Sequence, residues 1–150
     1  MPIATPPLVY QVVYHSIAVQ PLPASAHNVG LLHQARAYNE AHNITGLLLY
    51  AETTGEYLQV FEGDAAVVKA LYGRIMADPR HRSVSIVAEG MVPERTFPSW
   101  RMGFAPLEAK ELEQLTGYIN PRALHLPDAG AFAALLGLLA GFARTRDVSY

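Results

Sequence analysis

Short runs rich in β-branched and aromatic residues recur along the chain between polar turns, which is the pattern of β-strands. Five runs predict strands, at residues 8–18, 44–51, 56–62, 83–89 and 99–105. A polar turn at 52–55 joins the second and third strands as a hairpin. Because side chains alternate along a strand, one face of the first strand carries Tyr10, Val12, Tyr14 and Ser16. One face of the third strand carries Tyr57, Gln59 and Phe61.

Apolar residues recur at helical spacing in two segments between these strands. The spacing predicts helices over 25–42 and 64–78, with Ser25 and Asp64 as N-caps and Pro79 ending the second helix. The resulting order is strand, helix, strand, strand, helix, strand, strand. This order predicts an α+β fold with a ferredoxin-like βαββαββ mixed sheet and both helices on one face.

The other face of the sheet is also apolar, because it carries Leu47, Leu49, Leu58 and Val60. A sheet that is apolar on both sides needs a second cover. Two short C-terminal helices at 112–118 and 131–144 can supply it, and a partner or a second copy is the alternative. We therefore expect an N-terminal arm at 1–7, the main domain at 8–107 and a helical cap at 108–150.

Composition supports a single folded domain, since 150 residues with 51% apolar and 16% charged side chains can fill one core. The net charge of -2 gives no broad positive field, so a nucleic-acid partner is not expected. No apolar run is long enough to span a membrane and no signal-peptide pattern opens the chain, which indicates a cytoplasmic protein. The absence of cysteine excludes disulfides, zinc-thiolate sites and thiol nucleophiles.

Two amides, Asn39 and Gln59, stand where the helix and strand patterns call for core residues, and both should point into the space between sheet and helices. A buried amide without a partner costs about 1–3 kcal/mol, so each needs backbone, water or a ligand. Tyr14 faces the same space, and its hydroxyl can bond Gln59 as ordinary core. Alternatively, the three together fit a planar heteroaromatic ligand.

The remaining polar residues have simple structural interpretations. Arg74 and Asp78 are four residues apart, as in an exposed ion pair on a helix. The cluster at 80–82 can contact a phosphate, but it is also typical of a solvated turn. The six histidines form no metal-ligand motif, so no metal is expected.

Five segments in order resemble the BLUF domains, sensors of blue light using flavin, over roughly residues 8–107. VVYHS resembles the first-strand motif with the photoactive tyrosine, ARAYNEAHNITGLLLY the segment with the flavin-bonding asparagine, and EYLQVFEG the strand with the switching glutamine. LYGRIMADPRH resembles the second-helix segment that contacts the flavin. FPSWRMGF resembles the last-strand motif whose tryptophan and methionine change place with signalling state.

The resemblance implies a non-covalently bound flavin, FAD, and a switch in which excited flavin takes an electron from Tyr14 while Gln59 rearranges. The photoactive residues it implies are Tyr14, Gln59, Trp100 and Met102. The cofactor-binding residues it implies are Ser16, Asn39, Gln59, Arg74, Asp78, Arg80 and His81. No substrate is turned over, so the resemblance implies a sensor and not an enzyme.

The chain resembles the short stand-alone members, which signal to a separate protein effector, and a homo-oligomer is compatible with its apolar C-terminal segment. Two other functions stay open. One is a small acyl-phosphate hydrolase on the same fold, which the prolines and missing glycine of the loop at 19–25 disfavour, because a phosphate needs a nest of backbone donors. The other is a light-insensitive interaction module that has lost its flavin.

Overall fold

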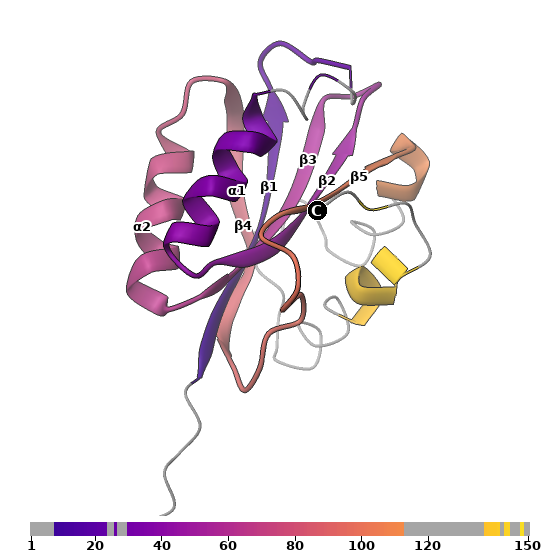
Figure 1. Ribbon diagram of the computed structural model, residues 1–150. Coiled ribbons are helices and arrows are strands. Elements are labelled where there is room, and N and C mark those ends of the chain that lie inside the picture. The colour runs from indigo at the N-terminus through magenta and orange to yellow at the C-terminus, as the bar shows by residue number, and fades with distance from the viewer. Residues whose placement is uncertain are drawn as a thin grey trace, which may run out of the picture.

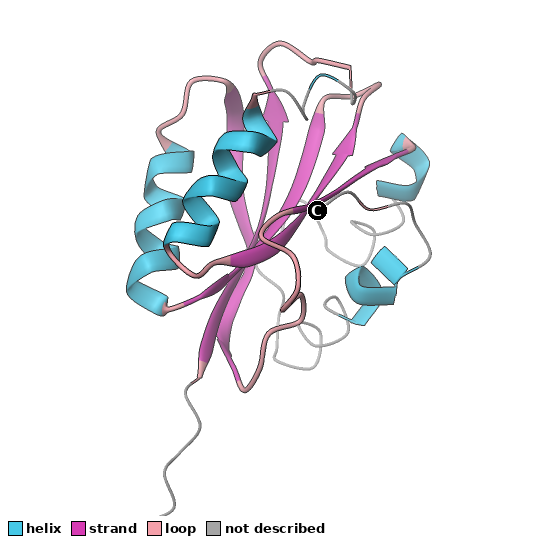
Figure 2. Cartoon of the chain, viewed as in Figure 1, coloured by secondary structure: helices cyan, strands magenta, loops and turns pink. Residues whose placement is uncertain are grey.

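A computed structural model describes residues 8–23, 26, 30–112, 137–141, 143–144 and 148. It contains seven elements in the predicted order (Figures 1 and 2). They are β1 (Val9–Ala18), α1 (Leu31–Ala41), β2 (Thr45–Ala51), β3 (Glu56–Gly63), α2 (Ala65–Met76), β4 (His81–Val92) and β5 (Gly103–Leu107). The predicted arm at 1–7 lies outside the described residues. No helix among the described residues is long and apolar enough to cross a membrane.

The five strands form one sheet in the order β4-β1-β3-β2-β5. The first four strands pair antiparallel, and β5 pairs parallel with β2. Each helix therefore connects two parallel strands that are separated by a third strand inserted between them, which is the split βαβ arrangement of ferredoxin-like folds. The predicted mixed sheet of the βαββαββ class is confirmed.

Both long helices pack on one face of the sheet (Figure 1). The core on this side contains Tyr10, Val12, Tyr14, Leu32, Ile44, Leu48, Tyr50, Phe61, Val68, Leu71, Met102 and Phe104. The even-numbered residues of β1 and the odd-numbered residues of β3 supply this face, as the alternation of strand side chains predicts. Asn39 and Gln59 are buried on the same side.

The opposite face is covered by parts of the C-terminal segment, drawn in yellow and orange in Figure 1. Residues 109–112 and 137–144, of which 142 is not described, are helical. Leu112, Leu139 and Ala143 pack into one cluster with the four predicted second-face residues Leu47, Leu49, Leu58 and Val60. The described residues thus confirm a C-terminal cover, whereas most of the two predicted helices lies outside the described residues.

The bounds of four predicted elements differ from those in the structure. The first helix begins at Leu31 with Gly30 as its N-cap, and the predicted cap Ser25 lies outside the described residues. The second helix has the predicted cap, because the Asp64 carboxylate accepts from the Val67 N–H at 3.4 Å, but it ends at Met76 instead of residue 78.

The last two strands differ for long-range reasons. Strand β4 spans twelve residues, including His81 and Arg82 of the expected turn, because it pairs with β1 from one end to the other. Strand β5 begins only at Gly103, because the carbonyls of Arg101 and Met102 accept from side chains of α1 instead of from the backbone of β2. Trp100 and Met102 therefore precede the strand that was predicted to contain them.

The backbones of β2 and β3 approach each other closely at Gly46. A Cβ at this position would lie 2.0 Å from the backbone oxygen of Val60 on β3. The Gly46 N–H donates to the carbonyl of Trp100 at 3.0 Å, which holds the segment before β5 against the sheet. Only glycine permits this approach of backbones.

Candidate functional site

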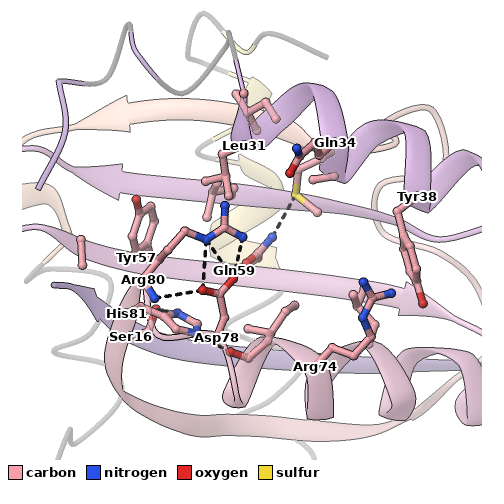
Figure 3. A pocket seen from close by; sticks show the side chains of 18 of the residues that line it. Ser16, Leu31, Gln34, Tyr38, Tyr57, Gln59, Arg74, Asp78, Arg80 and His81 are labelled. Atoms are coloured by element: carbon pink, nitrogen blue, oxygen red, sulfur yellow. Dashed lines mark hydrogen bonds and ion pairs between the residues drawn. The ribbon is translucent and has the colours of Figure 1, made fainter. Parts of the chain in front are cut away.

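A cavity of about 710 Å³ lies between α1, α2 and the sheet face that these helices cover. Its walls are largely apolar and carry a few polar side chains, which is the composition of sites for cofactor-sized molecules. Figure 3 shows Gln59 in the middle, with Asp78 and Arg80 beside it in this view, Tyr57 toward one end, and Tyr38 and Arg74 toward the other. A planar ligand inserted between the helices would meet groups from both helices and the sheet.

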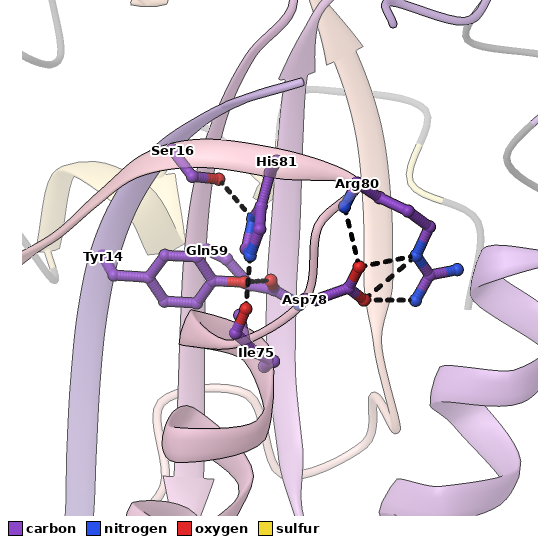
Figure 4. A network of polar contacts seen from close by, with 7 residues as sticks. All are labelled: Tyr14, Ser16, Gln59, Ile75, Asp78, Arg80 and His81. Carbon is purple, nitrogen blue, oxygen red and sulfur yellow. Dashed lines mark hydrogen bonds and ion pairs between the residues drawn. The ribbon is translucent and has the colours of Figure 1, made fainter. Parts of the chain in front are cut away.

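The floor of the cavity is made by β1 and β3, whose register pairs Tyr14 directly with Gln59. The two side chains are 2% and 7% exposed. The Tyr14 hydroxyl donates to Gln59 Oε1, and Gln59 Nε2 donates to Met102 Sδ at 3.4 Å (Figures 3 and 4). Because a phenol proton needs an acceptor, the first bond turns the amide oxygen toward Tyr14 and the amide nitrogen toward Met102.

Burial raises the pKa of the Tyr14 phenol far above its usual value of 10.0, and the neighbouring Tyr72 and Tyr57 raise it further. Burial also raises the pKa of Tyr57, two residues before Gln59 on the same strand face, to about 12. Both phenols are therefore protonated at neutral pH. Tyr14 thus acts as the hydrogen-bond donor in its contact with Gln59.

A second amide, Asn39 on α1, connects the helix to the segment before β5. It is 1% exposed, and its Nδ2 donates to the carbonyl of Arg101 at 2.6 Å. Arg36, one turn earlier, donates from Nε to the carbonyl of Met102 at 3.0 Å. Both pocket amides thus contact neighbouring residues of one short segment, Asn39 through backbone and Gln59 through the Met102 sulfur.

His81 joins three elements beside Tyr14 (Figure 4). Its Nε2 lies at the carbonyl of Ile75 at the end of α2, and its Nδ1 lies 3.1 Å from the Ser16 hydroxyl on β1. A carbonyl only accepts, so Nε2 carries a proton, and in the neutral ring Nδ1 accepts from Ser16. The ring also packs edge-on against Tyr14, with centroids 6.5 Å apart.

Three charged residues also line the cavity: Arg74, Asp78 and Arg80. Asp78 accepts from Arg80 Nε at 3.0 Å and from Arg80 Nη2 at 2.5 Å, and these hydrogen bonds lower the pKa of the Asp78 carboxyl. Arg74 lies over the ring of Tyr38, 4.8 Å from its centroid. The expected Arg74–Asp78 ion pair is therefore replaced by these two contacts, because the helix ends before residue 78.

The donor set fits the ring system of a flavin. Amides offer both N–H donors and a carbonyl acceptor, and the edge of a flavin ring presents carbonyl oxygens, a ring N–H and ring nitrogens. Asn39 and Gln59 line the cavity among apolar residues of both helices that can hold the faces of the ring. The cavity volume also lies in the range of roughly 300–1,000 Å³ found for small-molecule sites.

The structure brings together nearly all of the residues predicted for the site. Those that line the cavity are Tyr14, Ser16, Asn39, Gln59, Arg74, Asp78, Arg80, His81 and Met102. Trp100 is not among the lining residues, and it packs instead against the core of the opposite sheet face and stacks on Phe97, with centroids 5.7 Å apart. The part of the chain that the structure describes contains no cluster of residues suited to a metal ion.

Sequence reasoning missed four polar residues that line the cavity: Gln20, Gln34, Tyr38 and Tyr57. The strand alternation already placed Tyr57 on the face of Gln59, so this signal could have identified it. Tyr38 and Gln34 precede Asn39 by one and five residues on α1. Helical spacing alone does not assign them to the cavity, because only the position of α2 and the β1–α1 loop closes it.

Comparison with known proteins agrees with this geometry. The family described as "Sensors of blue-light using FAD" matches residues 9–103. Subunit alpha of the photoactivated adenylate cyclase of Euglena gracilis is 42% identical over 65 residues, which are 43% of this chain and 6% of that protein. Subunit beta is 37% identical over 79 residues, 52% of this chain and 9% of that protein. The matched part is a small fraction of either relative.

Solved structures match over a larger share of both chains. The dark-state structure of BlrB, described as a BLUF protein, is 27% identical with a TM-score of 0.65, and the match covers 90% of this chain and 97% of that chain. The photo-activated state of BlsA gives a TM-score of 0.68 at 21% identity, over 88% of this chain and 94% of that chain. At that identity the likeness to BlsA concerns the fold.

Proposed function

The chain belongs to the BLUF family of blue-light flavin sensors, and from this premise we propose that it holds a flavin between α1, α2 and the sheet and switches through Tyr14 and Gln59. The observation that carries the proposal is the chain of contacts from Tyr14 through Gln59 to Met102 in the floor of the cavity. The protein acts as a sensor that converts no substrate. Asn39 holds the ring edge, and Ser16, Arg74, Asp78, Arg80 and His81 hold the rest of the cofactor.

A bound flavin would supply the absorption of blue light and an excited state able to take up an electron. Tyr14 is placed to give that electron, and its hydroxyl proton already points at Gln59 Oε1. When the amide turns over, its nitrogen faces Tyr14 and its oxygen faces Met102. A thioether sulfur has no proton to donate, so the Gln59–Met102 contact is lost and Met102 is released.

We propose FAD as the flavin, which the family description supports. Heat denaturation of the purified protein followed by chromatography and mass spectrometry of the released cofactor identifies it. FAD as the main species supports the assignment, and FMN or riboflavin in its place contradicts it. This result does not bear on the Tyr14–Gln59 switch, which needs only the ring common to all three.

We further propose that residues 8–107 are the sensing unit and that residues 108–150 form a cap through which the signal reaches a separate protein effector. The packing of Leu112, Leu139 and Ala143 on the sheet face opposite the cavity supports a cap. Trp100 packs on that same core, so a change before β5 reaches the cap surface. Size-exclusion chromatography in darkness and under blue light shows whether a second copy of the chain is this effector.

The proposed switch is tested by visible absorption spectra before and after a blue flash, followed during return in darkness. The wild type should show a reversible red shift of the flavin band, whereas Gln59→Leu should bind flavin without the shift. Gln34→Leu is the matched control, since Gln34 lines the same cavity from α1 without contacting Tyr14 in the described hydrogen bonds. It should keep the shift. A normal shift in Gln59→Leu overturns the proposed switch.

A further inference from the structure

Glu62 is a fully buried acidic residue on the sheet face opposite the cavity. Its two oxygens accept four hydrogen bonds, from Gln11 Nε2 at 2.7 Å, Thr45 Oγ1 at 3.0 Å, Thr96 N–H at 2.7 Å and Phe97 N–H at 2.6 Å. Two of these donors belong to neighbouring strands and two to the backbone before β5. Burying a carboxylate costs free energy, which its hydrogen bonds offset, so the loss of any of these four donors would destabilise the buried group.

The two backbone donors belong to residues 93–102, the segment between β4 and β5 that we call the strap. Arg95 reinforces its start by donating to Thr45 Oγ1 at 2.8 Å, to the carbonyl of Glu62 at 3.0 Å and to the carbonyl of Asn43 at 2.8 Å. The start of the strap is therefore fixed to β2 and β3 by side chains with no part in the cavity. Neither Glu62 nor Arg95 lines the cavity.

The end of the strap is held by different groups. The carbonyls of Trp100, Arg101 and Met102 accept from Gly46 N–H, Asn39 Nδ2 and Arg36 Nε. Met102 also contacts the switching amide through its sulfur. The strap thus has one end bonded to the flavin site and one end bonded to Glu62, and the Trp100 N–H donates to the carbonyl of Phe97 at 3.3 Å between them.

We propose that Glu62 is a positioning residue that anchors the start of the strap, so that a change at Gln59 moves residues 100–102 while residues 95–97 stay fixed. This inference rests on the proposed function of the cavity. The fixed point confines the motion to the end that carries Met102 and Trp100. Without it the displacement spreads along the strap, and the packing of Trp100 on the opposite core is no longer defined.

The anchor is tested first in darkness by amide hydrogen exchange of Thr96 and Phe97, followed by NMR. Glu62→Gln replaces one acceptor oxygen by an NH₂ group, so one of the two backbone donors, Thr96 or Phe97, loses its acceptor whichever way the amide turns. Loss of one bond to a charged acceptor suffices for an about tenfold faster exchange. Val87→Ala is the matched control, because Val87 is buried in the same core on β4, at the far edge of the sheet from β5.

The second measurement compares the flavin-loaded proteins in darkness and under blue light. Trp100 is the single tryptophan of the chain, so quenching of its fluorescence by acrylamide reports the end of the strap, and hydrogen exchange reports its start. In the wild type, light should change Trp100 quenching and leave the exchange of Thr96 and Phe97 unchanged. In Glu62→Gln, light should accelerate the exchange of both amides.

The outcomes separate the anchor from the switch. Equal dark exchange in Glu62→Gln and Val87→Ala, or light-accelerated exchange of Thr96 and Phe97 already in the wild type, overturns the anchor. A wild type without any light response overturns the proposed function, and the dark exchange rates then decide the anchor alone. Should Glu62→Gln fail to fold, Arg95→Ala replaces it, because Arg95 is only half-buried and holds the same end.

Discussion

The hydrogen bond between Tyr14 and Gln59 makes a quantitative prediction about stability. Tyr14→Phe leaves the buried Gln59 oxygen without its donor, and Gln59→Leu leaves the buried Tyr14 hydroxyl without its acceptor. Each single variant should lose about 1–3 kcal/mol of unfolding free energy, which is the cost of a stranded polar group. The double variant removes both groups, so it should lose little more than one single variant. The expected coupling is about 1–2 kcal/mol.

Urea unfolding of the four proteins in darkness measures this coupling. Flavin is present far above its Kd, and its contribution to stability is subtracted with the Kd measured for each variant, because a bound ligand adds to the apparent free energy. Tyr14→Phe combined with Leu112→Ala is the control, since Leu112 is buried on the opposite face of the sheet, and these effects should add. Additivity of Tyr14→Phe and Gln59→Leu within about 0.5 kcal/mol would refute the bond as described.

Three further predictions follow from the same structure. Burial raises the pKa of Tyr57 from 10.0 to about 12, so the fold favours the neutral phenol, and this contribution to stability is lost as the pH rises from 10 to 12. Tyrosinate absorbance measures the pKa, and alkaline unfolding of Tyr57→Phe against the wild type measures the loss of stability. Arg80→Ala should raise the lowered pKa of Asp78, measured by NMR titration, and cost under about 1 kcal/mol, because Arg80 is exposed. Gly46→Ala should lose about 1–3 kcal/mol in urea unfolding, because the new Cβ meets the Val60 oxygen.

The parts of the structure that follow from local pattern could be predicted from the sequence. Two-residue alternation on β1 and β3 placed Tyr14 and Gln59 on the face toward the helices, and helical spacing placed Asn39 beside them. Their polarity at apolar positions indicated a ligand site or polar core contacts, and the resemblance to the BLUF family pointed to the ligand site. The cover of the second face could also be predicted, because a sheet with two apolar faces requires it.

Contacts between distant residues could not be predicted in this way. Glu62 accepts hydrogen bonds from the backbone N–H groups of Thr96 and Phe97, which lie 34 and 35 positions later in the chain. No periodicity of the sequence indicates such a partner. The bounds of β4 and β5 depend on ladder partners and strap contacts, so propensity alone misplaced them by two to four residues. The Arg74–Asp78 pair was expected from spacing on a helix that in fact ends two residues earlier than Asp78.

The place of β3 in the middle of the sheet constrains how any signal can begin. Gln59 has Tyr14 of β1 as its ladder neighbour on one side and Leu48 of β2 on the other, so its main chain belongs to two ladders at once. The backbone at Gln59 is thereby held from both sides, so the proposed switch has to begin in the torsions of one side chain. On the proposed mechanism, the signalling state therefore lasts as long as the Gln59 amide stays turned, and no strand of the sheet has to unfold for it to form or decay.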